Sequence, residues 1–113
     1  MNYNRDTTFL SVMLKYTTRI LRLMKTVNTY EKMLEDTDYQ DLFTFWILQI
    51  GENAKNISDD FRKQHTTIFW KEISGMRDIA AHGYETFDLP TLWNVIDKEI
   101  LPLHEFLLQQ TNE

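Results

Sequence analysis

Residues 67–84 read TIFWKEISGMRDIAAHGY, and this stretch decides the class of fold. Its apolar side chains recur every three or four residues, which is the spacing of a helix with one apolar face: Ile68, Phe69, Ile73, Met76, Ile79 and Ala80. Gly83 follows as the residue expected to terminate that helix in a left-handed conformation. The stretch therefore predicts a helix from about Thr67 to His82.

The N-terminal segment predicts a first, longer helix. Asp6 or Thr7 is a suitable N-cap, and apolar residues recur at helical spacing from Phe9 to about Asn28. The apolar arc is wider than one neighbour can cover. We therefore expect this helix to contact two partners, either within the fold or in a second subunit.

Two further helices complete the prediction. Asp38 caps a second helix over about residues 39–61, while Asp88 and Pro90 supply the cap and first turn of a fourth. Pro102 should bend the fourth helix or split off its last turn. No convincing strand pattern occurs, so the sequence predicts an all-α fold.

Length and composition bound the kind of protein. A chain of 113 residues fits one domain, residues 1–113. The absence of cysteine excludes a disulfide scaffold and a thiol nucleophile, and it agrees with a reducing cytoplasm. Apolar runs of only a few residues predict neither a membrane span nor a signal peptide. We expect a soluble, cytoplasmic protein.

Charge is distributed unevenly along the chain. The net charge of −5 argues against a protein that coats nucleic acid through bulk electrostatics. Within the first predicted helix, however, Lys15, Arg19 and Arg22 lie within about 60° of one another, in a stretch without an acid. These three are candidate RNA contacts, although a solvated helix face has the same pattern.

The end of the 67–82 helix holds the densest polar chemistry in the chain. Arg77, Asp78, His82 and Tyr84 fall within eight residues, and the first three face away from the helix's own apolar side. Asp78 and His82 are four residues apart, so the carboxylate could orient the imidazole.

Arginine and histidine together suit phosphodiester cleavage. The guanidinium matches phosphate oxygens, and the imidazole can take a proton from a 2′-hydroxyl near neutral pH, so no metal is required. The spacing alone favours a structural alternative, in which Arg77 pairs with Glu52 or Asp78 and His82 caps the helix end.

Other side chains favour structural roles. The three histidines lie on different segments without a paired spacing, which argues against a metal site: His65, His82 and His104. The tryptophans and most phenylalanines lie on apolar helix faces and are expected in the core or a dimer interface. Trp93, near the edge of its face, is the best candidate for stacking on a base.

Several segments together resemble one family. The pattern Arg77, four residues, His82, any residue, Tyr84 is similar to the signature of HEPN domains, specifically of HepT-like toxin ribonucleases. Residues 51–54, GENA, resemble that family's Gly-Glu-Ala-type segment, and residues 69–78 resemble its Trp, Ile, Gly, hydrophobic, Arg-Asn/Asp lead-in. The likeness covers about residues 5–110.

The resemblance implies a four- to five-helix HEPN-type bundle that dimerises, so that the Arg/His motifs of two subunits line one cleft. It implies a metal-independent endoribonuclease without a cofactor, in which His82 does acid/base work and Arg77 binds the scissile phosphate. Asp78 stands where many relatives carry asparagine. We expect that carboxylate to raise the pKa of His82 and to repel RNA slightly.

The resemblance also implies a partner. In a type VII-like toxin–antitoxin pair, an MntA-like nucleotidyltransferase adenylylates the motif tyrosine, here Tyr84, and the two proteins can assemble beyond the homodimer. Two other functions stay open: a noncatalytic HEPN adaptor, and a substrate-binding subunit of a nucleotidyltransferase.

Overall fold

The computed structural model describes the backbone of residues 2–82 and 88–111 and the side chains of residues 5–77 and 88–111. Within these ranges the chain is helical and contains no strand, which confirms the predicted all-α class. The helices are, in chain order, α1 (Asn2–Met24), α2 (Tyr30–Leu34), α3 (Thr37–Lys55), α4 (Asp59–Gln64), α5 (Trp70–His82), α6 (Leu89–Lys98) and α7 (Ile100–Thr111).

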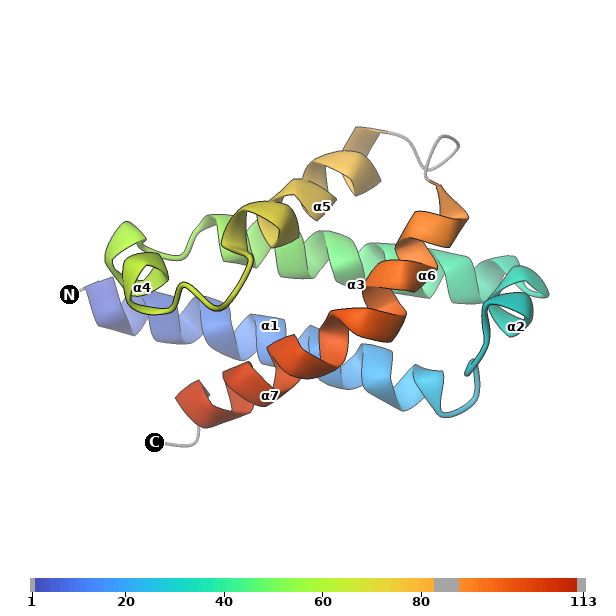
Figure 1. Cartoon of the computed structure of the whole chain (residues 1–113), viewed down its shortest axis with the longest axis horizontal. Coiled ribbons are helices and arrows are strands. Elements are labelled where there is room, and N and C mark those ends of the chain that lie inside the picture. Colours follow the sequence, from blue (N-terminus) through green and yellow to red (C-terminus); the bar gives the residue numbers. More distant parts are fainter. Residues whose placement is uncertain (1, 83–87, 112–113) are drawn as a thin grey trace.

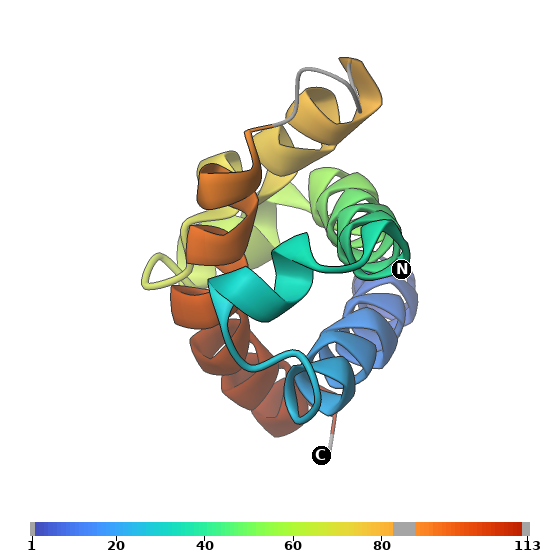
Figure 2. The ribbon, with the colours of Figure 1, turned by 90° about the vertical axis from the view of Figure 1, so that its right-hand side faces the viewer.

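The two longest helices, α1 and α3, lie side by side and run antiparallel (Figure 1). α5 packs mainly on α3, while α7 packs on α1. α6 contacts α3 and leads into α7, so the pair crosses the two long helices diagonally (Figure 1). The view along the bundle shows α5 at one end of the section and α7 at the other (Figure 2). The last turn of α5 therefore rises away from the body of the bundle.

The core lies between these helices and contains mainly aliphatic side chains. Its fully buried members include Met13, Ile20, Phe43, Ile47, Ile50, Leu92, Ile96, Ile100 and Leu107. These residues come from α1, α3, α6 and α7, on the faces that helical periodicity marks as apolar. One polar contact crosses this core, where Thr17 Oγ1 lies 3.0 Å from His104 Nδ1 and joins α1 to α7.

The start of α1 differs from the prediction. Neither Asp6 nor Thr7 caps the helix, because α1 already begins at Asn2. The buried Asp6 carboxylate instead accepts hydrogen bonds from the backbone N–H of Ser58 at 2.8 Å and from its hydroxyl at 2.6 Å. Ser58 is the N-cap of α4, so Asp6 ties α4 to α1. The expectation that α1 contacts two partners is confirmed within the fold, by α3 and α7.

The helix predicted over residues 39–61 is two helices. Ser58 interrupts it, because its hydroxyl accepts the N–H of Phe61 at 3.2 Å and starts α4. The Arg62 guanidinium closes the turn by donating to three carbonyls around the end of α3, those of Ala54, Lys55 and Ile57. The apolar pattern continues across this break, so periodicity could not reveal it.

A short helix, α2, lies where the sequence predicted none. Thr29 caps it by accepting the N–H of Lys32 at 3.1 Å, and Met33 is fully buried against the bundle.

The predicted N-cap of the following helix, Asp38, is wrong by two residues. Asp36 is the N-cap of α3, and its carboxylate accepts the N–H of Asp38 at 2.9 Å.

The remaining helices follow the prediction more closely. α5 ends at His82 as predicted but begins three residues later than expected. Asp88 is the N-cap of α6, although its carboxylate accepts the Thr91 hydroxyl at 2.5 Å and no backbone N–H. The predicted fourth helix is split at Glu99, in the turn before Pro102, because proline lacks the N–H that would continue the helix. The piece split off is all of α7 and not a last turn.

Candidate ribonuclease site

Arg77 lies in the second half of α5, where this helix crosses α3. Its Nε donates to Oε2 of Glu52 on α3 at a distance of 2.6 Å. The two side chains are partly exposed, 35% for Arg77 and 46% for Glu52. The ion pair between Arg77 and Glu52 that the sequence offered as one structural alternative is therefore present.

Gly51 allows the two helices to approach each other at this point. A Cβ atom on Gly51 would lie 2.8 Å from the backbone nitrogen of Arg77 and 2.9 Å from both Arg77 Cβ and the carbonyl oxygen of Ile73. Two of these three atoms are backbone, so they cannot move without moving α5. Glycine is required for this close approach, and the next residue, Glu52, receives the guanidinium.

The Arg77–Glu52 pair acts on orientation more than on stability. Ion pairs that remain exposed to solvent contribute about 0–1 kcal/mol to the free energy of unfolding. A guanidinium is a rigid planar fork with five N–H donors, and a charge-assisted hydrogen bond at Nε fixes the direction of the whole fork. The pair therefore orients a cationic group at the surface where α5 leaves the bundle.

The rest of the motif is described only in part. His82 is the last residue of α5, which places its backbone about 140° around the helix and about 7.5 Å along the axis from Arg77. The side chains of Asp78 and His82 lie outside the described residues, as do Gly83 and Tyr84. The Asp78–His82 contact, the glycine terminator and the position of Tyr84 stay predictions.

The three candidate RNA contacts share α1. Lys15 and Arg22 are exposed, and Arg19 is half-buried. Lys15 Nζ lies 5.3 Å and Arg19 Cζ 5.4 Å from the ring centre of Tyr16, which is within cation–π range. α3 packs against both α1 and α5, so these cations and Arg77 flank the same helix from two sides.

The tryptophans have packing partners, as predicted. Trp70 is buried, whereas Trp46 and Trp93 are half-buried. The rings of Trp46 and Trp93 each meet Phe43 edge-on, with 6.3 Å between ring centres. Trp93, the expected exception, therefore packs partly against the core.

Phe45 is an aromatic residue that the sequence reasoning missed. Its side chain is 48% exposed, and its ring meets Tyr16 edge-on at 6.2 Å between centres. A phenylalanine that falls off the predicted apolar face of its helix is the signal that could have marked it.

The other two histidines are held in packing contacts. His65 lies against the ring of Phe61, with 4.3 Å between centres, and His104 contacts Thr17. Over the described part of the chain, no three histidine, aspartate or glutamate side chains gather in a way that could hold a metal ion. None of the described helices is long and apolar enough to cross a membrane.

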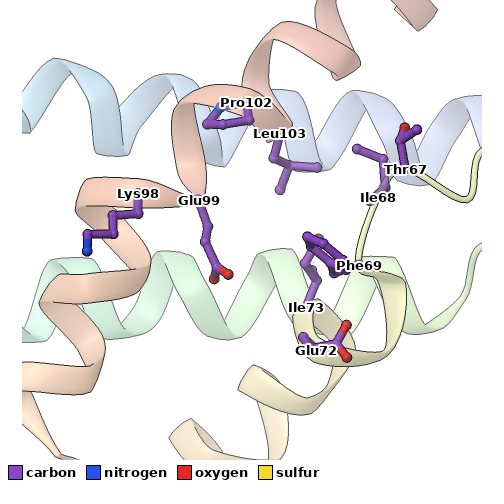
Figure 3. A pocket seen from close by; sticks show the side chains of 9 residues that line it. All are labelled: Thr67, Ile68, Phe69, Glu72, Ile73, Lys98, Glu99, Pro102 and Leu103. Atoms are coloured by element: carbon purple, nitrogen blue, oxygen red, sulfur yellow. The ribbon is translucent and has the colours of Figure 1, made fainter.

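A cavity of about 140 Å³ lies between the start of α5 and the junction of α6 with α7 (Figure 3). Apolar side chains form most of its wall, and Glu72, Lys98 and Glu99 are its charged residues. The two carboxylates outnumber the single ammonium group. This cavity is therefore poorly suited to the phosphates of a nucleic acid.

The all-α bundle agrees with a HEPN-type fold. A sequence model of the family described as ribonuclease HepT-like matches residues 13–109, and the chain belongs to this family.

Three relatives illustrate the similarity. A Methanocaldococcus jannaschii protein, named for gamma-glutamylcyclotransferase and for a proposed RNase activity, is 35% identical over 100 residues, covering 80% of this chain and 45% of its own length. A Caldanaerobacter subterraneus protein, also named for a proposed RNase activity, is 35% identical over 77 residues, covering 68% and 69% of the two chains. A probable ribonuclease HepT of Thermococcus cleftensis is 41% identical over 51 residues, covering 45% and 46%. The chain thus spans less than half of the first relative, and no solved structure gives a significant match.

Proposed function

We propose that the protein is a metal-independent endoribonuclease and the toxin of a toxin–antitoxin pair. It works as a homodimer in which the Arg77 and His82 motifs of two subunits line one cleft. The observation that carries this proposal is the Arg77–Glu52 contact, because it orients a partly exposed guanidinium, a group suited to phosphate, on the helix that also bears His82. Membership of the HepT-like ribonuclease family and the RNase names of the relatives support it.

The proposed reaction is an internal transesterification. His82 takes the proton of a ribose 2′-hydroxyl, and the 2′ oxygen attacks the neighbouring phosphorus. The bond from phosphorus to the 5′ oxygen breaks, an acid returns a proton to that oxygen, and the products are a 2′,3′-cyclic phosphate and a 5′-hydroxyl. Arg77 offsets the negative charge that develops on the phosphoryl oxygens. A dimer brings two copies of His82, which suffice for one base and one acid.

Cleavage of a defined RNA in the presence of a chelator tests the proposal. We expect the parent protein to cut and to leave a 2′,3′-cyclic phosphate, whereas Arg77→Ala and His82→Ala lose cleavage and stay folded. Lys71→Ala, an exposed cation in the first turn of α5, is the matched control and should cut normally. Strict dependence on added Mg²⁺, or cleavage retained in His82→Ala, would overturn the imidazole mechanism.

The proposed partner is an MntA-like nucleotidyltransferase that adenylylates Tyr84. The transfer joins the AMP phosphorus to the phenolic oxygen and releases pyrophosphate from ATP. The added phosphodiester anion would repel RNA and compete for Arg77. Intact-mass measurement after incubation with the partner and ATP should show an AMP adduct on the parent and none on Tyr84→Phe. An adduct mapped to another residue would remove Tyr84 from the proposal.

The noncatalytic adaptor and the substrate-binding subunit make a different prediction. Both require a protein that leaves RNA uncut while it still binds the nucleotidyltransferase. That combination, obtained with a folded dimer, would replace the ribonuclease proposal.

A further inference from the structure

A groove of about 570 Å³ runs between the second half of α1 and the first half of α3. Arg19 and Arg22 line it from α1, and Leu42, Phe45 and Trp46 line it from α3. Its lining carries two guanidinium groups and no carboxylate, in a chain whose net charge is −5. The groove therefore concentrates positive charge against the general charge of the protein.

Exposed aromatic surface accompanies this charge. Phe45 is 48% exposed, and its ring meets the edge of Tyr16. The Tyr16 ring in turn has Lys15 and Arg19 within cation–π range, at 5.3 and 5.4 Å. Aromatic rings and cations thus alternate across the α1–α3 surface, which is the composition of surfaces that bind single-stranded nucleic acid.

The groove is aligned with the candidate ribonuclease site. Phe45 and Glu52 are seven residues apart on α3, so they share one face of the helix and lie about 10 Å apart along its axis. Glu52 holds Arg77, and α5 packs on α3 on the opposite side from α1 (Figure 2). A strand bound at Arg77 would therefore have to cross the exposed face of α3 that Glu52 and Phe45 share in order to reach the groove on the α1 side.

We infer that the α1–α3 groove is a subsite for the single-stranded RNA flanking the scissile phosphate. This inference rests on the proposed function for the identity of its ligand. Arg19 and Arg22 bind backbone phosphates, and an unpaired base lies against the ring of Phe45. Duplex RNA is excluded from this contact, because a paired base has its faces covered by its neighbours.

Binding of a 5′-labelled, unstructured 12-nucleotide RNA tests the inference, in protein carrying His82→Ala to prevent cleavage. Phe45→Leu keeps apolar surface but removes the ring, and we expect binding weakened about fivefold or more. The Arg19→Gln, Arg22→Gln double variant should reduce the slope of log affinity against log salt by about 1.4, because single strands lose about 0.7 per phosphate contact.

Matched controls lie away from the groove. Phe69→Leu alters a ring that is 67% exposed beside the acidic cavity, and it should bind RNA like the parent. The Lys63→Gln, Lys98→Gln pair removes the same charge as the arginine pair from two exposed positions on α4 and α6. We expect its salt slope to match the parent's. If the lysine pair reduced the slope of log affinity against log salt as much as the arginine pair, only the net charge of the protein would matter, and the inference would be overturned.

Two other results would also overturn it. In one, the groove variants bind RNA with parental affinity. In the other, they keep RNA affinity but lose the homodimer in sedimentation or lose the nucleotidyltransferase, which would make the groove a protein interface. Cleavage is scored separately in His82-intact protein. RNA binding through the groove without cleavage would sustain the inference and refute the ribonuclease proposal. Cleavage by the parent, combined with parental RNA binding by the groove variants, would sustain the ribonuclease proposal and refute the inference.

Discussion

At the scale of single residues, Gly51 and Glu52 perform two linked tasks. Gly51 removes the side chain that would otherwise hold α5 away from α3, and Glu52 then reaches Nε of Arg77 at 2.6 Å. The sequence offered an ion pair of Arg77 with Glu52 or Asp78 as one structural alternative, and the structure contains the pair with Glu52. The sequence could not assign the role of Gly51, which depends on which residue of another helix lies opposite it.

Glu52→Gln should lower the kcat of RNA cleavage about tenfold without raising KM. The neutral amide loses a charge-assisted hydrogen bond worth roughly 1.5–3 kcal/mol, so Arg77 is held less firmly in the transition state. Removing a negative charge beside Arg77 does not weaken attraction for phosphate. Steady-state kinetics check this split, and a raised KM with unchanged kcat would contradict a positioning role. Urea unfolding should change by less than about 1 kcal/mol.

Gly51→Ala should destabilise the protein by about 1–3 kcal/mol and lower cleavage, because the new Cβ meets backbone atoms of α5 and displaces Arg77. Gly75→Ala is the matched control on α5, since nothing lies within 4 Å of a Cβ there. It should stabilise the protein by about 0.5–1 kcal/mol through the higher helix propensity of alanine. Urea denaturation measures both, and equal stability of the two variants would argue against the close-approach role.

At the scale of elements, helix ends follow local side-chain hydrogen bonds that the apolar pattern does not contain. The pattern runs smoothly from α3 into α4, yet Ser58 and Arg62 break the helix between them. Asp6 supports the break from α1, across 52 residues of sequence. Pro102 marked the break between α6 and α7 to within a few residues, because proline by itself disfavours helix continuation, although the sequence did not predict that all of α7 lies beyond it.

Ser58→Ala should cost about 1–2 kcal/mol of unfolding free energy, because it removes the acceptor for the Phe61 N–H and the donor to Asp6. Asp6→Asn and the double variant complete a cycle, in which we expect a coupling energy above about 0.5 kcal/mol. Thr91→Ala removes a comparable hydroxyl bond on the exposed surface and should change stability by less than about 0.5 kcal/mol. Additive effects at Ser58 and Asp6 would show that the two do not act together.

At the scale of the whole molecule, α5 packs mainly on α3, and its end rises from the body of the bundle (Figure 1). Arg77 lies on this helix, partly exposed. An arrangement that brings two such helices together would enclose both motifs. The proposed composite cleft requires two such helices to come together in a dimer.

Sedimentation over a dilution series should give twice the chain mass of 13.6 kDa, with no stable monomer at micromolar concentration. The proposed composite cleft forms only in a dimer, which would shield Arg77 from the water that competes for phosphate on the open surface of a single chain. A compact monomer that still cleaves RNA at the parental rate would remove the composite cleft from the mechanism.

The sequence by itself determined the all-α class, the faces that form the core, the end of α5 at His82 and the family. Each of these follows from spacing within one helix or from a motif contiguous in sequence, because periodicity reports which side of a helix is buried. The assignment of Tyr84, Asp78 and His82 to a mechanism also comes from the sequence and stays a proposal.

Only the tertiary structure decided what lies opposite each face. It placed Gly51 against the backbone of Arg77, moved Asp6 from a helix cap to an anchor for Ser58, and joined Arg19 to Phe45 in one groove. These contacts join residues between 26 and 52 positions apart in sequence. Their partners are fixed by the angle and depth at which helices cross, and those depend on the packing of the whole core and not on the pattern of any one segment.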